Sequence, residues 1–109
     1  MINFQIEHFF SDGVYSRKMT IPQGVQVPTH KHKFNHMSIV ASGKVQVTVD
    51  GETKEYVAPA QIEIKKDQVH TVYALEETVW FCIHATNVVD ADEIDHELIS
   101  GEENAVQCC

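Results

Sequence analysis

The feature that most constrains this chain is an alternation of apolar and polar residues with a period of two. Between Lys44 and Asp50 every second residue is a valine, and polar residues stand between the valines. Such a pattern buries one face of a β-strand and exposes the other. Asp50-Gly51 follows, and this dipeptide favours a two-residue hairpin turn because both positions tolerate a positive φ. We therefore expect Thr53–Val57 to return beside the first strand.

Further β-rich segments are distributed along the chain and are separated by Gly, Pro, Asp or Glu residues. They are Asn3–Phe10, Val14–Ile21, Gln61–Lys65, Val69–Ala74 and Thr78–His84. With 109 residues, 43% of them apolar, the chain has the length of one domain. Many short strands predict an all-β sandwich or barrel. The apolar runs are too short for a transmembrane helix, so we expect no membrane insertion.

Acidic charge is concentrated after residue 87. The chain has 8 Lys and Arg against 16 Asp and Glu, a net charge of −8. Residues 88–109 contain seven of these acids and no Lys or Arg, so the net charge is −7 there and −1 over 1–87. Nucleic-acid binding needs a basic face for the phosphates, and we expect none here. The sequence predicts a β-barrel domain over 1–87 and an acidic helix and tail over 88–109.

The acidic segment begins with signals of a short helix. Asp90 can cap its N-terminus, with Glu93 three positions later as in a capping box. Ile94 and Leu98 share one face at helical spacing, and Gly101 is typical of a helix C-terminus. These residues predict a short C-terminal helix after the strands.

The three cysteines are Cys82, Cys108 and Cys109, too few for a disulfide framework. We expect Cys82, which lies in an apolar run, to be a buried thiol. The N-terminus has no basic start followed by an apolar stretch, so no secretory signal is expected. Both observations are typical of a protein of the reducing cytoplasm.

Histidines are the residues in this sequence that point most directly to chemistry. His30, His32 and His36 lie within seven residues, and His70 precedes a separate β-rich segment. In an extended chain His30 and His32 point to the same side, and a short bend would bring His36 back to them. Neutral imidazole is a common metal ligand, and an all-imidazole site suits Zn, Cu, Fe, Ni or Mn. The alternative is an exposed run of histidines and lysines on the surface.

The spacing of these histidines resembles the cupin family. The first cupin motif is a glycine, five residues, His-x-His, three or four residues, a glutamate, six residues and a glycine. Here Gly24, His30, His32, His36 and Gly43 stand at those spacings. The one departure is that His36 occupies the position of the glutamate.

The second cupin motif, Pro-x-Gly followed by two residues and a histidine, is matched less well. Its positions read Lys65, Asp67 and His70, so only the histidine is kept. The resemblance implies an all-β fold, the cupin-type double-stranded β-helix or jelly-roll barrel. It also implies a divalent transition metal (Mn, Fe, Ni, Cu or Zn) inside the barrel. The implied ligands are His30, His32, His36 and His70.

A site of four histidines has a distinct electrostatic character. Four neutral imidazoles leave a divalent metal at about +2, whereas a glutamate would reduce the charge to about +1. The more positive metal is a stronger Lewis acid and would attract an anionic ligand such as an enolate or carboxylate. A six-coordinate metal would leave two open positions for a substrate, or for a substrate and O₂. The resemblance therefore implies a dioxygenase-like oxidoreductase, whereas a closed tetrahedral zinc would be structural.

A non-catalytic role stays open beside the enzymatic one. The same barrel could bind a small ligand through the metal, or bind a metal only for stability. Strand parity places no acid inside the barrel, and Glu63 and Asp67 would point inward only if the parity breaks. An isomerase or lyase would need a general base near its substrate, so these activities are disfavoured.

Strand parity also predicts which other side chains face inward. If His36 and His70 point inward, their neighbours two and four positions on do so too, namely Ser38, Val40, Val72 and Ala74. On the last strand we expect Val79, Phe81 and Ile83 to face inward, and Trp80, Cys82 and His84 to face outward. A tryptophan on an outer face is typical of an interface, so a homodimer is expected, as the resemblance also implies. His8, His84 and His96 are interpreted as structural or surface residues.

Overall fold

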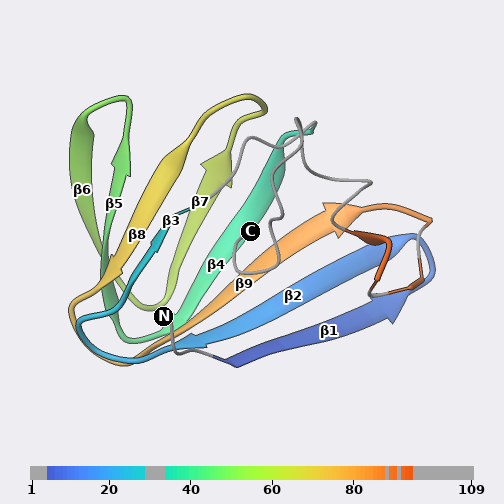
Figure 1. Cartoon of the computed structure of the whole chain (residues 1–109), viewed down its shortest axis with the longest axis horizontal. Coiled ribbons are helices and arrows are strands. Elements are labelled where there is room, and N and C mark those ends of the chain that lie inside the picture. Colours follow the sequence, from blue (N-terminus) through green and yellow to red (C-terminus); the bar gives the residue numbers. More distant parts are fainter. Residues whose placement is uncertain (1–4, 29–33, 88, 91, 95–109) are drawn as a thin grey trace.

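The computed structural model describes residues 5–28, 34–87, 89–90 and 92–94. This part of the chain forms two antiparallel sheets that face each other (Figure 1). The first has five strands in the order β1-β2-β9-β4-β7, and the second has four in the order β3-β8-β5-β6. Their bounds are β1 (Gln5–Ser11), β2 (Val14–Ile21), β3 (Gln26–Pro28), β4 (His36–Ser42), β5 (Lys44–Val49), β6 (Glu52–Val57), β7 (Ala60–Ile64), β8 (His70–Ala74) and β9 (Thr78–Ala85). The predicted all-β class is confirmed.

The tight turn between β5 and β6 forms where the sequence predicts it. Asp50 and Gly51 have φ values of 51° and 78°, and Val49 pairs with Glu52 across the hairpin. Both central residues thus have the positive φ that a two-residue turn of this hand requires. The turn fixes the β5–β6 register, and with it the side chains that β6 presents to the interior.

The two glycines that flank the first histidine motif also adopt positive φ. Gly24 has a φ of 84° and Gly43 a φ of 92°, a region that residues with a Cβ atom avoid. At Gly43 a Cβ atom would additionally collide with the backbone at Glu77 and Thr78, whereas the space around Gly24 is open. Gly43 is therefore required both for its backbone conformation and for a close approach of two chain segments.

The core lies between the two sheets. Tyr15, Met19 and Trp80 are its largest side chains from the five-stranded sheet, and Val45 and Val72 face them from the four-stranded sheet. The inward parity predicted for Ser38, Val40, Val72 and Ala74 is confirmed, since all four are buried. Within the described residues no helix is long and apolar enough to cross a membrane.

Strand β9 has the opposite parity to the one predicted. Trp80 is fully buried, whereas Phe81 on the other face is only partly buried. Trp80 pairs with Val40 on one side and Met19 on the other, and both partners are buried. Because directly paired residues of antiparallel strands share a face, Trp80, Cys82 and His84 must all face inward. The expectation of an outward tryptophan is therefore wrong, and the predicted homodimer rests on the family resemblance alone.

The segment after β9 begins a helical turn at Asp90. The Asp92 N–H donates to Asp90 Oδ1 at 2.8 Å, and the Ile94 N–H donates to the Asp90 carbonyl at 3.2 Å. Ile94 is fully buried and belongs to the core cluster. Asp90 thus caps as predicted, while the rest of the expected helix lies outside the described residues.

Candidate metal centre and adjoining cavity

Two of the four predicted ligands, His36 and His70, belong to the described residues, and His30 and His32 lie outside them. His36 is the first residue of β4 in the five-stranded sheet, and His70 is the first residue of β8 in the four-stranded sheet. Their relative exposures are only 5% and 1%. The fold therefore buries one imidazole on each of the two facing sheets.

The surroundings of His70 shift its pKa. Burial lowers the pKa of His70 from 6.5 to about 4, because desolvation disfavours the charged imidazolium. Its ring is consequently neutral at physiological pH. A neutral imidazole has the lone pair that a transition metal needs, so His70 fits the role of a ligand.

The structure places a further histidine, His84, beside His36. His84 is 4% exposed, and its ring centroid lies 4.1 Å from that of His36, with an angle of 30° between the rings. Sequence patterning missed this neighbour because the parity predicted for β9 was wrong. The pairing of β4 with β9 is the signal that could have found it: Met37 pairs with Ile83, so the next position on each strand brings the two histidines together.

A chain of aromatic and basic side chains continues from His84 across the inner face of β2 and β1. The ring of Tyr15 lies 6.2 Å from that of His84, and the ring of His8 lies 5.8 Å from that of Tyr15. Arg17 Nε donates a hydrogen bond of 2.8 Å to the Tyr15 hydroxyl. That hydroxyl also forms a hydrogen bond of 2.6 Å with His8 Nδ1. The hydrogen bonds thereby fix Tyr15 and the buried guanidinium in place.

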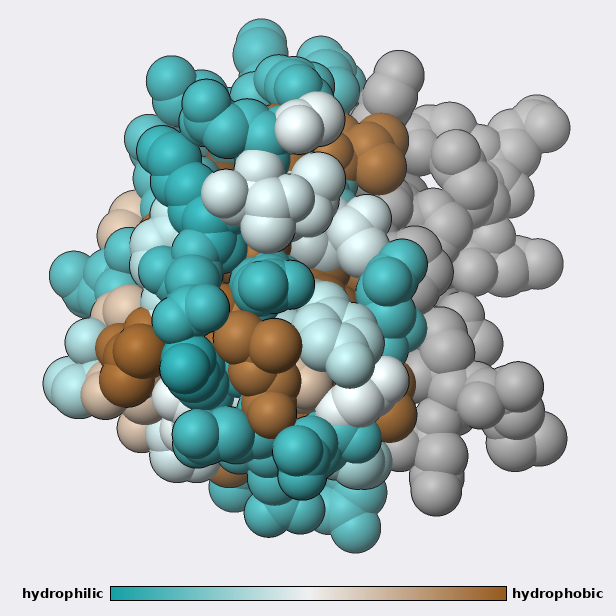
Figure 2. Space-filling view, turned by 90° about the vertical axis from the view of Figure 1, so that its left-hand side faces the viewer, coloured by the Kyte–Doolittle hydropathy of each residue, from teal (hydrophilic) through white to brown (hydrophobic). Residues whose placement is uncertain are grey.

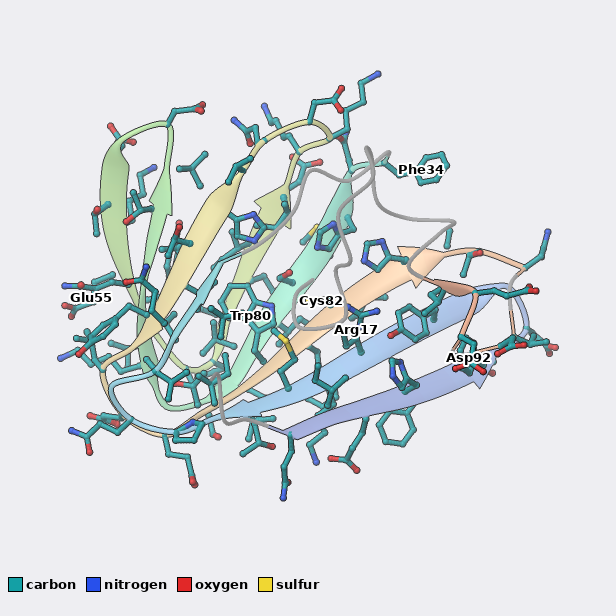
Figure 3. All side chains as sticks on the ribbon, viewed as in Figure 1. Arg17, Phe34, Glu55, Trp80, Cys82 and Asp92 are labelled. Carbon is teal, nitrogen blue, oxygen red and sulfur yellow. The ribbon has the colours of Figure 1, made fainter. Side chains whose placement is uncertain are left out.

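Cys82 lies on the same inward face as Trp80, and the two point from β9 into the space between the sheets (Figure 3). Trp80 Nε1 donates to the Cys82 sulfur at 3.1 Å, and Ser38 Oγ donates to it at 3.8 Å. Cys82 is buried, as predicted.

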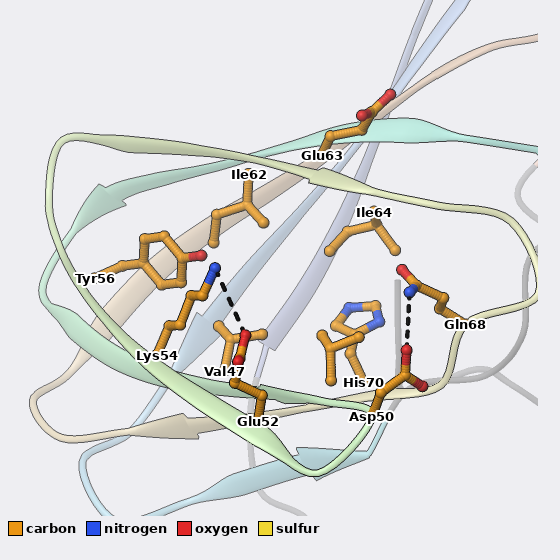
Figure 4. Close-up of a pocket in the computed structure, with 11 residues that line it drawn as sticks. Val47, Asp50, Glu52, Lys54, Tyr56, Ile62, Glu63, Ile64, Gln68 and His70 are labelled. Atoms are coloured by element: carbon orange, nitrogen blue, oxygen red, sulfur yellow. Dashed lines mark hydrogen bonds and ion pairs between the residues drawn. The ribbon is translucent and has the colours of Figure 1, made fainter.

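A cavity of about 320 Å³ adjoins His70 (Figure 4). Its apolar surface comes from β5, β6 and β7, namely Val47, Val49, Tyr56, Ile62 and Ile64. Its polar surface comes from Asp50, Glu52, Lys54, Glu63, Gln68 and His70. His70 thus belongs both to the predicted ligand set and to the wall of the cavity.

The acids of this cavity correct the expectation that no acid faces the interior. Asp50 and Glu52 line the cavity mouth, although both residues are exposed to solvent. Lys54 Nζ lies 3.8 Å from Glu52 Oε1, and Gln68 Nε2 donates to Asp50 Oδ2 at 3.2 Å. Strand parity missed these acids because it was applied only to the apolar positions of each strand, whereas the inward face of β6 is polar.

The described residues include side chains of the type that binds a transition metal through imidazole. His36 and His70 are buried histidines, the donor type that Mn, Fe, Ni, Cu and Zn accept. Among the residues that the structure describes, no three His, Cys, Asp or Glu side chains form a metal-binding group. With His30 and His32 outside that part of the chain, the four-histidine set stays a prediction.

Comparisons with known proteins agree with this architecture. A family model described as cupin domain matches residues 17–84. Among solved structures, KdgF from Halomonas sp. superposes with a TM-score of 0.69 at 14% identity, covering 80% of this chain and 82% of that one. An RmlC-like cupin with a double-stranded β-helix fold from Methanocaldococcus jannaschii gives 0.67 at 17% identity, covering 79% and 83%.

The cupin domain of an XRE family transcriptional regulator from Enterobacter cloacae gives a TM-score of 0.63 at 16% identity, covering 73% of this chain and 92% of that one. A search of curated proteins finds no significant match. At these identities the structural neighbours show a common fold and nothing further. The family match, by contrast, spans more than half of the sequence and includes His30, His32, His36 and His70. By its sequence and by its two antiparallel sheets, this chain belongs to the cupin family.

Proposed function

We propose that this protein is a metal-dependent cupin that binds a small oxygen-containing molecule and acts on it as a dioxygenase-like oxidoreductase. The proposed ligands of the divalent transition metal are His30, His32, His36 and His70. The observation that carries the proposal is the double position of His70, which is a buried, neutral imidazole and also a wall residue of the cavity. A metal held there would supply Lewis-acid activation of a ligand oxygen.

The chain's own residues would provide the surroundings for such a ligand. Val47, Ile62 and Ile64 give the cavity an apolar surface from which water is excluded when a ligand fills it. A volume of about 320 Å³ lies at the lower end of the range for small-molecule sites. His70 would place its ring beside this space. These properties suit a small, largely apolar molecule with an oxygen at one end.

Elemental analysis of the full chain, purified without added metal, tests the proposed centre. We expect about one equivalent of Mn, Fe, Ni or Cu in the wild-type protein and its loss in His36→Ala and in His70→Ala. His8→Gln is the matched control, since it removes a histidine that lies outside the ligand set. Metal retained at wild-type level in His70→Ala would disprove the assignment. An O₂-uptake screen of the loaded protein would then test the oxidative chemistry.

A second candidate function is that of a binding or sensing module without catalysis. It is favoured by the structural likeness to the cupin domain of a transcriptional regulator. The two functions predict different results with the same protein. A sensing module would bind its ligand at the metal and consume no O₂, whereas an oxidoreductase would consume O₂ in proportion to the ligand that is turned over.

A further inference from the structure

We infer that the charges at the cavity mouth select the ligand: the cavity admits a small, mostly apolar molecule whose outer end is a protonated amine, and it rejects the same molecule with a carboxylate there. This inference deepens the proposed function, because it names the class of molecule that reaches the predicted metal centre. It rests, however, on the cavity itself and not on the presence of a metal.

The cavity has a direction that the ligand must follow. His70 is buried beneath the tip of the β5–β6 hairpin, since it pairs with Val49, and the apolar side chains of Val47, Ile62 and Ile64 line the space beside it (Figure 4). Asp50, Glu52 and Lys54, all exposed, lie where the cavity meets solvent. A bound molecule would therefore turn its apolar part to the interior and one end to this mouth.

The charges around the mouth are unequal. Asp50 and Glu52 contribute two negative charges and Lys54 one positive charge, which leaves 1 − 2 = −1, whereas Glu63 shares the outward face of β7 with Met37 of β4. Lys54 lies 3.8 Å from Glu52, so its charge is already offset by that acid. Asp50 accepts a hydrogen bond from the Gln68 amide, which orients the carboxylate without neutralising it. The field that an entering molecule meets is thus negative.

On the side of the molecule that β5 and β6 form, hydrophilic residues surround smaller hydrophobic areas (Figure 2). The whole chain adds a net charge of −8. An anionic ligand would be repelled both at a distance and at the mouth, although a metal beyond the mouth would attract its oxygen. A ligand with an amine outside and a neutral oxygen inside satisfies both ends.

The size of the effect follows from Coulomb's law. A unit charge about 6 Å from another in water changes binding by about threefold at low ionic strength. A net charge of −1 should therefore give about a threefold step from amine to neutral molecule, and about another threefold step to the carboxylate. The steps should shrink at high salt, where the Debye length falls to about 3 Å.

Three probes of nearly equal size test the selection, namely benzylamine, benzyl alcohol and benzoate. Their binding to the full-length, metal-free protein is followed by amide chemical shifts, and the shifts at Val47, Ile62 and Ile64 locate the probe. We expect the affinity order amine, alcohol, carboxylate. Equal affinities, the reverse order, or no binding by any probe would overturn the inference.

Matched variants assign the selection to named residues. Asp50→Asn removes one charge and keeps the turn, because Asn tolerates the positive φ of this position. It should remove most of each step, because the remaining charges of Glu52 and Lys54 offset each other. Glu55→Gln is the control, since it removes an identical charge on the outward face of β6, where Glu55 lies 3.4 Å from Lys44. Equal effects of both variants would reduce the selection to net charge and overturn the role of the mouth.

The outcome separates this inference from the proposed function. If the order of the probes holds but elemental analysis finds no metal, the cavity selects as inferred and the metal centre is wrong. If metal is bound but the three probes bind equally, the metal centre stands and the selection by charge is wrong.

Discussion

Apart from the buried His70, the inner faces of the two sheets hold their polar groups in opposite ways. The five-stranded sheet carries Tyr15, Arg17 and His84 deep in the interior, where hydrogen bonds and ring contacts fix them. The four-stranded sheet carries Glu52 and Lys54 at its open end, where water reaches both. A buried polar group depends on its partner for stability, whereas an exposed charge can be changed at little cost. The first face is therefore constrained by folding, and the second is free to set which ligand enters.

The largest expected effect concerns the two faces of β9. Trp80→Ala should lower the free energy of unfolding by about 3–5 kcal/mol, because it leaves a cavity among fully buried neighbours. Phe81→Ala removes a large side chain from the partly buried outer face and should cost less than half as much. Urea denaturation of both variants measures the difference. A greater loss for Phe81→Ala would mean that the outer face is covered in solution.

The next effect is a pH dependence that belongs to the four-stranded sheet. Because the pKa of His70 is about 4 in the folded protein, against 6.5 for a histidine surrounded by water, the unfolded chain binds more protons between these values. Stability is therefore complete above about pH 6.5 and falls as the pH decreases toward 4, by about 3 kcal/mol in total. Unfolding of chelator-treated protein across this range measures the slope.

The variant His70→Gln is the control for that pH dependence. It cannot be protonated in this range, so the part of the slope due to His70 should disappear. An identical pH profile in wild type and His70→Gln would show that other groups cause the acid sensitivity, and that the interior of the four-stranded sheet is less dry than its burial indicates.

A smaller effect tests the hydrogen bonds of the five-stranded sheet. Tyr15→Phe removes the hydroxyl that accepts a hydrogen bond from Arg17 and forms another with His8, and we expect a loss of about 1–3 kcal/mol. The matched variant is Thr48→Val, which removes a hydroxyl that forms an exposed 2.8 Å bond with Thr53. That change should stay within about 0.5 kcal/mol. Equal losses, measured by thermal unfolding, would contradict the contrast between the two sheets.

The smallest effect is expected at the mouth of the cavity. Glu52→Gln breaks an exposed ion pair between Glu52 and Lys54. The side chain of Glu52 is 75% exposed and that of Lys54 is 65% exposed. Such pairs contribute little in water, so stability should change by less than about 0.5 kcal/mol. A loss above about 1 kcal/mol, measured by urea denaturation, would show that this rim supports the fold and is not free to vary.

Much of the architecture could be predicted from the sequence because alternation and turn chemistry are local properties. The valines of β5, the Asp50-Gly51 turn and the flanking glycines each specify their own conformation. β3 was not foreseen because its three residues are too few to establish an alternation. In β9 both faces are apolar, and only the pairing with β2 and β4 decides which one is buried.

The candidate site was predictable only as far as its spacing in the sequence. His36 and His70 stand in recognisable motifs, and the fold buries both. His84 has no motif, because its place beside His36 results from the register of two strands that are far apart in sequence. The acids at the cavity mouth were missed for a related reason: the inward face of β6 is polar, so a search for apolar parity passes over it.

The β5–β6 hairpin has a consequence for how such a protein can change over generations. Its tip is closed by a two-residue turn, and the side chains at and beside this tip reach the cavity without belonging to the core. Point mutations at Asp50, Glu52 and Lys54 can therefore exchange one ligand preference for another while the barrel and its histidines are inherited unchanged. Descendants of this chain could diversify at the hairpin tip first, while the sequence of the five-stranded sheet's interior changes more slowly.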